Sequence, residues 1–170
     1  MSIDEAHICA AKYATEKACP DRDGAREIRS GWYFPWRFAG EPLIGSNGII
    51  VDKRTRRVVR LGSAYPVERD LRAYDAGYPL TAAHLVVTAV GDKSRAIALL
   101  QQLRVSKIEP EEAHGVTWRI PRVLSRSEIQ AKLMTLPADF GVIQVYFSVE
   151  LLERARQEQC FSFQLQEAAV

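Results

Sequence analysis

The sequence predicts an α+β protein, with an N-terminal helix, a small antiparallel sheet and a second helix, followed by a layered α/β C-terminal half. Three observations predict this class. The 170 residues are 47% hydrophobic and 26% charged, which is the balance of a folded globular chain. In the first half, one helical pattern precedes short runs with period-two alternation. From about residue 78, strand and helix patterns alternate regularly.

The N-terminal helix is expected over residues 2–18. Ser2 and Glu5 have the spacing of a capping box, and apolar or small residues recur after them at helical intervals. The pair Cys19-Pro20 stops the pattern. The polar stretch 21–30 that follows is typical of a connection.

An aromatic strand is expected over residues 31–38, with the sequence GWYFPWRF. Alternation sends Tyr33 and Arg37 to one face, where they are available to a partner. The opposite face is expected to belong to the core, and its residues are Trp32, Phe34, Trp36 and Phe38. Pro35 cannot donate to a ladder, which predicts an edge strand or a local bulge.

The segment 39–48 holds three glycines, which predicts a loop that uses left-handed backbone conformations. Two strands in hairpin spacing follow, and then an amphipathic helix that ends at Gly77. These elements are expected at residues 49–53, 58–61 and 67–77. The stretch 54–57 between the two strands is polar, as a hairpin turn requires.

The C-terminal half alternates between strands and helices. The strands are expected at residues 84–90, 116–123, 141–148 and 160–166, and the helices at residues 94–104, 125–136 and 149–157. Ser125 and Glu128 repeat the capping-box spacing. The acidic run Glu109, Glu111 and Glu112 is expected to form a solvated loop. The expected division is 1–78 and 79–170, and the sequence leaves open whether the halves share one core.

Charge and composition exclude several classes of protein. The net charge of +2 is too small to argue for direct nucleic-acid binding or for an anionic membrane surface. No run approaches about 18 apolar residues, and the acidic N-terminus does not resemble a signal peptide. Three dispersed cysteines fit free thiols in a reducing compartment. We therefore expect a cytoplasmic protein without a membrane partner.

The side chains that usually carry catalysis form no recognisable motif. His7, His84 and His114 lack metal-ligand spacing, and no Cys-x-x-Cys accompanies them. The loop 45–48 (GSNG) has neither the nucleophile-elbow pattern nor the lysine of a phosphate-binding loop. We therefore expect no catalytic residues, no metal and no cofactor, and the chain is predicted not to be an enzyme.

The densest positive charge lies at the tip of the predicted hairpin, where Arg54, Arg56 and Arg57 follow one another closely. This cluster is either a solvated turn or a grip for an acidic partner or phosphates. Aromatic and arginine side chains dominate protein interfaces. The hairpin tip, together with Tyr33 and Arg37, is therefore the predicted partner-binding set, and the unassigned C-terminal half is the other candidate surface.

Three segments in the first half resemble a known family. They are residues 31–36 (GWYFPW), 42–53 (PLIGSNGIIVDK) and 61–74 (LGSAYPVERDLRAY), in that order. Together they resemble the immunity protein 35 family, also called the YrhB domain, over about the first 78 residues. Where that family usually has Thr-Gly in the hairpin turn, this chain has Thr55-Arg56.

The resemblance implies a small cytoplasmic protein that binds and neutralises a cognate bacterial toxin of an interbacterial competition system. We expect it to occlude the active site or substrate path of the toxin, whose class stays open. One alternative is a small hydrolase or transferase that uses the loop 45–48, with Asp52 or Glu68 as acid or base. The other is a structural or regulatory module that self-associates through the strand 160–166. The oligomeric state is left open.

Overall fold

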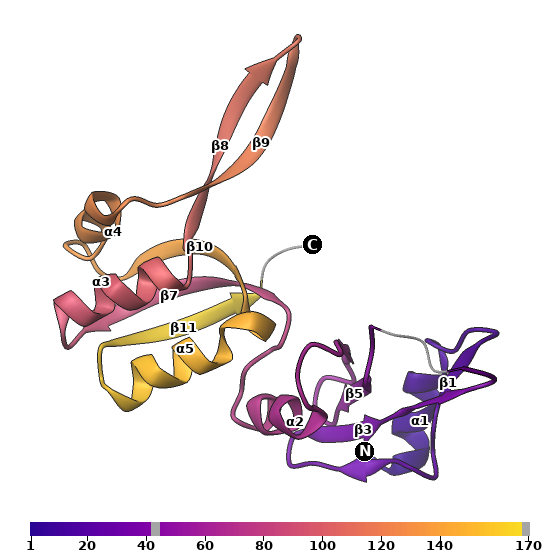
Figure 1. The fold of residues 1–170 in the computed structure, drawn as a ribbon. Coiled ribbons are helices and arrows are strands. Elements are labelled where there is room, and N and C mark those ends of the chain that lie inside the picture. The colour runs from indigo at the N-terminus through magenta and orange to yellow at the C-terminus, as the bar shows by residue number, and fades with distance from the viewer. Residues whose placement is uncertain (42–44, 168–170) are drawn as a thin grey trace. The chain divides into compact units, whose positions relative to one another are not determined.

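The computed structural model describes residues 1–41 and 45–167. The chain divides into two compact units, Met1–Leu80 and Thr81–Val170, two residues beyond the boundary expected from the sequence. Each unit combines helices with antiparallel strands, as Figure 1 shows. The α+β class and the N-terminal helix followed by strands are therefore confirmed.

The first unit is built around a four-stranded antiparallel sheet in the order β2-β3-β5-β6, with β1 and β4 as a separate pair. In chain order its elements are α1 (Ile3–Ala11), β1 (Ala18–Pro20), β2 (Arg26–Glu27), β3 (Gly31–Phe34), β4 (Trp36–Phe38), β5 (Gly48–Asp52), β6 (Val58–Leu61) and α2 (Val67–Asp75). Ala6 and Ala10 of α1 pack on a core that includes Phe34, Ile49 and Val51. The helix thus covers one face of the sheet.

Helix α1 begins as expected and ends early. The side chain of Ser2 accepts from the amide of Glu5, and the Glu5 carboxylate accepts from the amide of Ser2, so the capping box is present. The helix ends at Ala11, because the chain turns back at Thr15, whose hydroxyl accepts from the amide of Ala18 at 3.1 Å. A threonine side chain that hydrogen-bonds to nearby backbone groups offers them an alternative to the hydrogen bonds of the helix.

The aromatic strand is split at Pro35 into β3 and β4. The expected interruption is present, but β3 is an interior strand, paired with both β2 and β5. Tyr33 is consequently 5% exposed, so the expectation that it faces outward is wrong. Its hydroxyl donates to the carbonyl of Asn47 at 2.6 Å, and the Arg26 guanidinium covers its ring. Both faces of β3 are covered, since Tyr33 and Phe34 on opposite faces are buried, and period-two alternation does not predict this.

The hairpin of β5 and β6 and the helix α2 match their expected positions. In the loop before β5, Gly45 and Gly48 have positive φ, as expected for its glycines, while residues 42–44 lie outside the described part of the chain. At the hairpin tip, Arg56 has φ +60°. Arginine therefore occupies a left-handed position that glycine adopts at lower cost.

Replacing Arg56 with glycine is expected to raise the free energy of unfolding by about 1 kcal/mol, because the left-handed strain is removed. The ion pair that is lost, 3.6 Å from Arg56 to Glu5, is exposed and contributes little. Urea denaturation measures the change. Arg54→Gly, two positions earlier and without a positive φ, is the matched control. A gain at Arg54, or a loss at Arg56, contradicts the expectation.

The second unit has a three-stranded antiparallel sheet in the order β10-β7-β11. Its elements are β7 (Ala82–Val90), α3 (Lys93–Gln102), β8 (Ser106–Ala113), β9 (Val116–Val123), α4 (Arg126–Lys132), β10 (Ala138–Gln144), α5 (Val145–Gln157) and β11 (Phe161–Glu167). Ala83, Leu85 and Val87 of the central strand are fully buried. Helix α5 packs on all three strands and also contacts α3. Strand β11 forms one edge, as the self-association alternative requires.

Strands β8 and β9 form a two-stranded hairpin that extends from the second unit beyond its sheet (Figure 1). The sequence predicts β9 but assigns the acidic run to a solvated loop, and this is wrong. Pro110 and four charged residues hide the strand pattern of β8. The turn consists of His114 and Gly115, both with positive φ, as a two-residue type I′ hairpin requires.

Candidate partner-binding surface

The hairpin of β8 and β9 carries an unusual amount of exposed apolar surface. Trp118 is 56% exposed and Ile108 is 59% exposed. The exposed large hydrophobic residues of the hairpin are Ile108, Val116, Trp118, Ile120 and Val123. A two-stranded hairpin on its own is marginally stable in water. Clustered exposed apolar residues mark surfaces that bind other molecules, so this hairpin is the candidate site.

Each face of the hairpin follows from the strand register, because cross-strand partners share a face. Trp118 pairs with Glu111, Ile120 with Glu109, and Arg122 with Lys107. We call this side the Trp118 face, and with Val116 its residues are Lys107, Glu109, Glu111, Val116, Trp118, Ile120 and Arg122. The opposite side is the Ile108 face, with Ile108, Pro110, Glu112, Thr117, Arg119 and Pro121.

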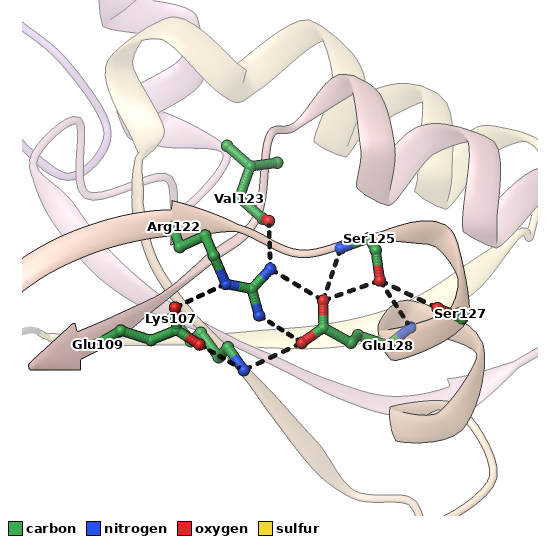
Figure 2. A network of polar contacts seen from close by, with 7 residues as sticks. All are labelled: Lys107, Glu109, Arg122, Val123, Ser125, Ser127 and Glu128. Atoms are coloured by element: carbon green, nitrogen blue, oxygen red, sulfur yellow. Dashed lines mark hydrogen bonds and ion pairs between the residues drawn. The ribbon is translucent and has the colours of Figure 1, made fainter.

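A network of ion pairs holds the root of the hairpin against helix α4, as Figure 2 shows. Arg122 donates to Glu109 at 2.7 Å and to both carboxylate oxygens of Glu128, at 2.5 and 3.1 Å. Lys107 Nζ lies 2.8 Å from Glu109 and 3.0 Å from Glu128. Glu128 also accepts from the amide of Ser125, which completes the capping box of α4. The network thus ties both strands to the first turn of a helix.

These contacts shift the pKa values of the groups involved. Hydrogen bonds from Arg122 are the largest cause that holds the pKa of Glu128 well below its ordinary value, followed by the backbone of Ser125. The pKa of Glu109 is lowered by Arg122 and then by Lys107. The pKa values of Arg122 and Lys107 are raised by the same carboxylates. All four groups are therefore charged at neutral pH.

Acidification is expected to weaken this anchor. Because the folded-state pKa values of Glu109 and Glu128 are lowered, the network stabilises the fold fully above the unfolded-state pKa of about 4.3. This contribution is lost as the pH falls further, through the lower folded-state values. The advantage of the wild type over Glu128→Gln in unfolding free energy should therefore shrink below pH about 4. Glu111→Gln is the control, and a wild-type advantage that stays constant with pH contradicts the expectation.

A hollow of about 460 Å³ lies beside the hairpin root. His84, Ser106, Ile108, Pro121, Lys132, Asp139 and Val142 are among its lining residues. His84 Nδ1 lies 3.0 Å from Asp139 Oδ2, while Asp139 Oδ1 accepts from the amide of Gly141 at 2.7 Å. A bulge in β10, in which Gly141 has φ +85°, holds Asp139 in this position. Within the described chain, no hydrogen bond joins Ser106 to His84.

The structure separates the partner-binding residues that the sequence suggests. Arg54, Arg56 and Arg57 lie together in the turn between β5 and β6, where Arg54 and Arg56 are exposed and Arg57 is half-buried. Arg37 is exposed on β4, and its guanidinium bonds to Asp21 and Asp23. Whether these arginines contact a partner stays a prediction. Tyr33 belongs to a different sheet from Arg37 and is buried.

The carboxylates named for an enzymatic alternative stabilise the first unit. Asp52 accepts from the backbone of Arg54 and Thr55 and from the hydroxyls of Thr55 and Tyr74. Burial by itself would raise the pKa of Asp52, but these hydrogen bonds lower it overall. Glu68 forms an ion pair with Arg26 at 3.2 Å. In the loop 45–48, the Ser46 hydroxyl bonds to Trp36 and to the carbonyl of Leu61.

Comparison of the chain with protein-family models, with curated proteins and with solved structures gave no match. Among residues 1–41 and 45–167, no helix is both long and apolar enough to span a bilayer. The same residues contain no group of three His, Cys, Asp or Glu side chains placed to hold a metal ion. The three cysteines are free thiols.

Proposed function

We propose that this chain is a cytoplasmic inhibitor that binds a cognate bacterial toxin and blocks its active site or substrate path, without catalysis of its own. One observation carries the proposal: the hairpin of β8 and β9 exposes five large apolar side chains and is anchored at its root by the network around Arg122. Binding by a preorganised element costs less conformational entropy than binding by a mobile one.

The shape of the hairpin suits the occlusion of a cleft. Two strands are about 5 Å apart, and side chains extend from both faces, so the hairpin is narrow enough to enter a groove. Its apolar residues lie on both faces, and the removal of either face from water is energetically favourable. The toxin as partner is supported by the resemblance of segments 31–36, 42–53 and 61–74 to the immunity protein 35 family.

Co-expression with the product of the adjacent gene, where the family resemblance places the toxin, tests the proposal. The two proteins are expected to co-purify as a stable complex, and cells that produce both are expected to grow where cells with the toxin alone do not. The catalytically inactive form of the toxin should bind equally well, because the inhibitor needs the cleft and not the reaction. Absence of a complex and of protection would contradict the proposal.

A hydrolase is the second candidate, and the hollow beside the hairpin root favours it. There, the carboxylate of Asp139 contacts Nδ1 of His84, and Ser106 lines the same hollow. In a serine hydrolase, the imidazole takes the hydroxyl proton while the carboxylate orients the ring. Turnover of p-nitrophenyl acetate by the isolated chain, lost in both His84→Ala and Ser106→Ala, would favour this candidate over the inhibitor.

A further inference from the structure

Each outer edge of the hairpin carries a proline that disfavours pairing with a further strand. The turn has two residues, so Ala113 and Val116 form the hydrogen-bonded closing pair, and such pairs then alternate along the ladder. Pro110 and Pro121 fall at positions of the other kind, whose nitrogens point outward. Proline has no amide hydrogen, so β8 lacks one outward donor near its middle, at Pro110, and β9 lacks one near the root, at Pro121. Contact through the faces of the hairpin is therefore favoured over strand addition.

The two faces are not equally free. At the root of the Ile108 face, Ile108 and Pro121 line the hollow together with Val142 of β10. On the Trp118 face, Val116, Trp118 and Ile120 form a continuous apolar row along one strand, about 13 Å long. Tryptophan is the side chain most enriched among residues that dominate binding energy. The Trp118 face therefore offers the stronger anchor.

The charges of the Trp118 face indicate the chemistry of its partner. Glu109 is already bonded to Arg122 and Lys107. Glu111, directly across from Trp118, forms no ion pair with any residue that the structure describes. On the other face, Glu112 and Arg119 carry opposite charges at diagonal positions, so the formal charges of that face cancel without an outside cation. The Trp118 face thus presents one exposed carboxylate outside the ion-pair network beside an exposed indole, and a single cation can contact both.

We infer that the hairpin binds its partner through the Trp118 face, by side-chain contact and not by strand addition. The partner protein presents an apolar cleft bordered by lysine or arginine. Trp118, Val116 and Ile120 fill this cleft of the partner, and Glu111 pairs with a basic side chain at its border. This inference rests on the proposed function for the identity of the partner. The use of the Trp118 face and its preference for a basic partner are also tested by an experiment that does not require the toxin.

The first experiment measures the affinity of variants for the toxin encoded beside the chain. Trp118→Ala is expected to weaken binding about 30-fold or more, as a central aromatic anchor does. Glu111→Lys should weaken it at least about 10-fold at low salt. Glu112→Lys makes the same charge change one residue away on the opposite face and should have an effect below about 3-fold. Equal affinity in all variants overturns the inference and leaves the proposed function standing.

The second experiment needs no toxin, so it also decides the matter if the wild type fails to bind one. Two amphipathic peptides of alternating Leu and Lys, or alternating Leu and Glu, are titrated into the full chain while the indole N–H resonance of Trp118 is followed. The Lys peptide should shift this resonance at lower concentration than the Glu peptide, and Glu111→Lys should abolish the preference where Glu112→Lys does not. No preference, or the reverse preference, overturns the inference.

Discussion

Replacing Gly141 with alanine is expected to lower the free energy of unfolding of the second unit by about 3 kcal/mol. Gly141 has φ +85°, a left-handed conformation that costs other residues about 1–2 kcal/mol. A Cβ at this position would also lie 2.1 Å from the carbonyl oxygen of Ser106, where strand β8 begins. That carbonyl belongs to the backbone, so the strain is relieved only by moving a strand. Urea denaturation of the wild type and of the Gly141→Ala variant measures the loss.

Gly115→Ala separates the two causes of this loss. Gly115 also has a positive φ, of +74°, but a Cβ there meets nothing within 4 Å. This variant is expected to lose only about 1 kcal/mol, the cost of the backbone conformation. Losses of equal size in the two variants would show that the approach of β10 to Ser106 does not constrain the fold.

The Gly141 variant has a functional consequence as well. The bulge that contains Gly141 lies against the root of the hairpin and holds Asp139 toward His84. Because Ser106 begins β8, its displacement is expected to shift the strand that carries Glu109 and Glu111. We therefore expect the Gly141 variant to bind the toxin more weakly than the Gly115 variant, even at temperatures where both are folded.

Shortening the hairpin is expected to abolish toxin binding and protection while the fold persists. Residues 110–119 are replaced by Asn-Gly, so that a two-residue turn connects Glu109 to Ile120. These two residues form a pair of the same hydrogen-bonding kind as the natural closing pair, so the new type I′ turn fits the register. Glu109 and Arg122 are kept, and the anchor to α4 is therefore preserved.

The melting temperature of the shortened protein should change little, because residues 110–112 and 114–119 are exposed. Its affinity for the toxin should fall by a factor of about 1,000 or more, since the central anchor and its surrounding contacts are lost together. Affinity is measured by titration calorimetry and protection by growth assays. Full protection by the shortened protein would assign binding to another surface, of which the arginine-rich turn between β5 and β6 is the first to test.

Local features of the fold are predictable to within a few residues. The capping boxes at Ser2 and Ser125, the hairpin of β5 and β6, and helix α2 all form where the sequence places them. The early end of α1 and the strands β1, β2 and β8 are not predicted, and residues 145–148, expected to be strand, form the first turn of α5. Thr15 ends the helical path through a turn, and β8 is a strand that faces no core and so carries no apolar alternation.

The candidate site is predicted less well than the fold. The sequence indicates a binding protein and draws attention to its arginines and to an aromatic strand, but Tyr33 of that strand is buried. The exposed row on β9 is visible only as one more strand pattern. Three apolar residues at alternate positions give the same sequence pattern whether they pack in the core or lie exposed at a binding surface.

By itself, the sequence determined the class of fold, most of the helices and strands, and the absence of a familiar catalytic motif, because these depend on residues within a few positions of one another. Only the tertiary structure decided that β3 is an interior strand, that β8 and β9 form a hairpin separate from the three-stranded sheet, and that Trp118 is exposed. Burial is set by which distant segments pack together, and spacing along the chain does not contain that information.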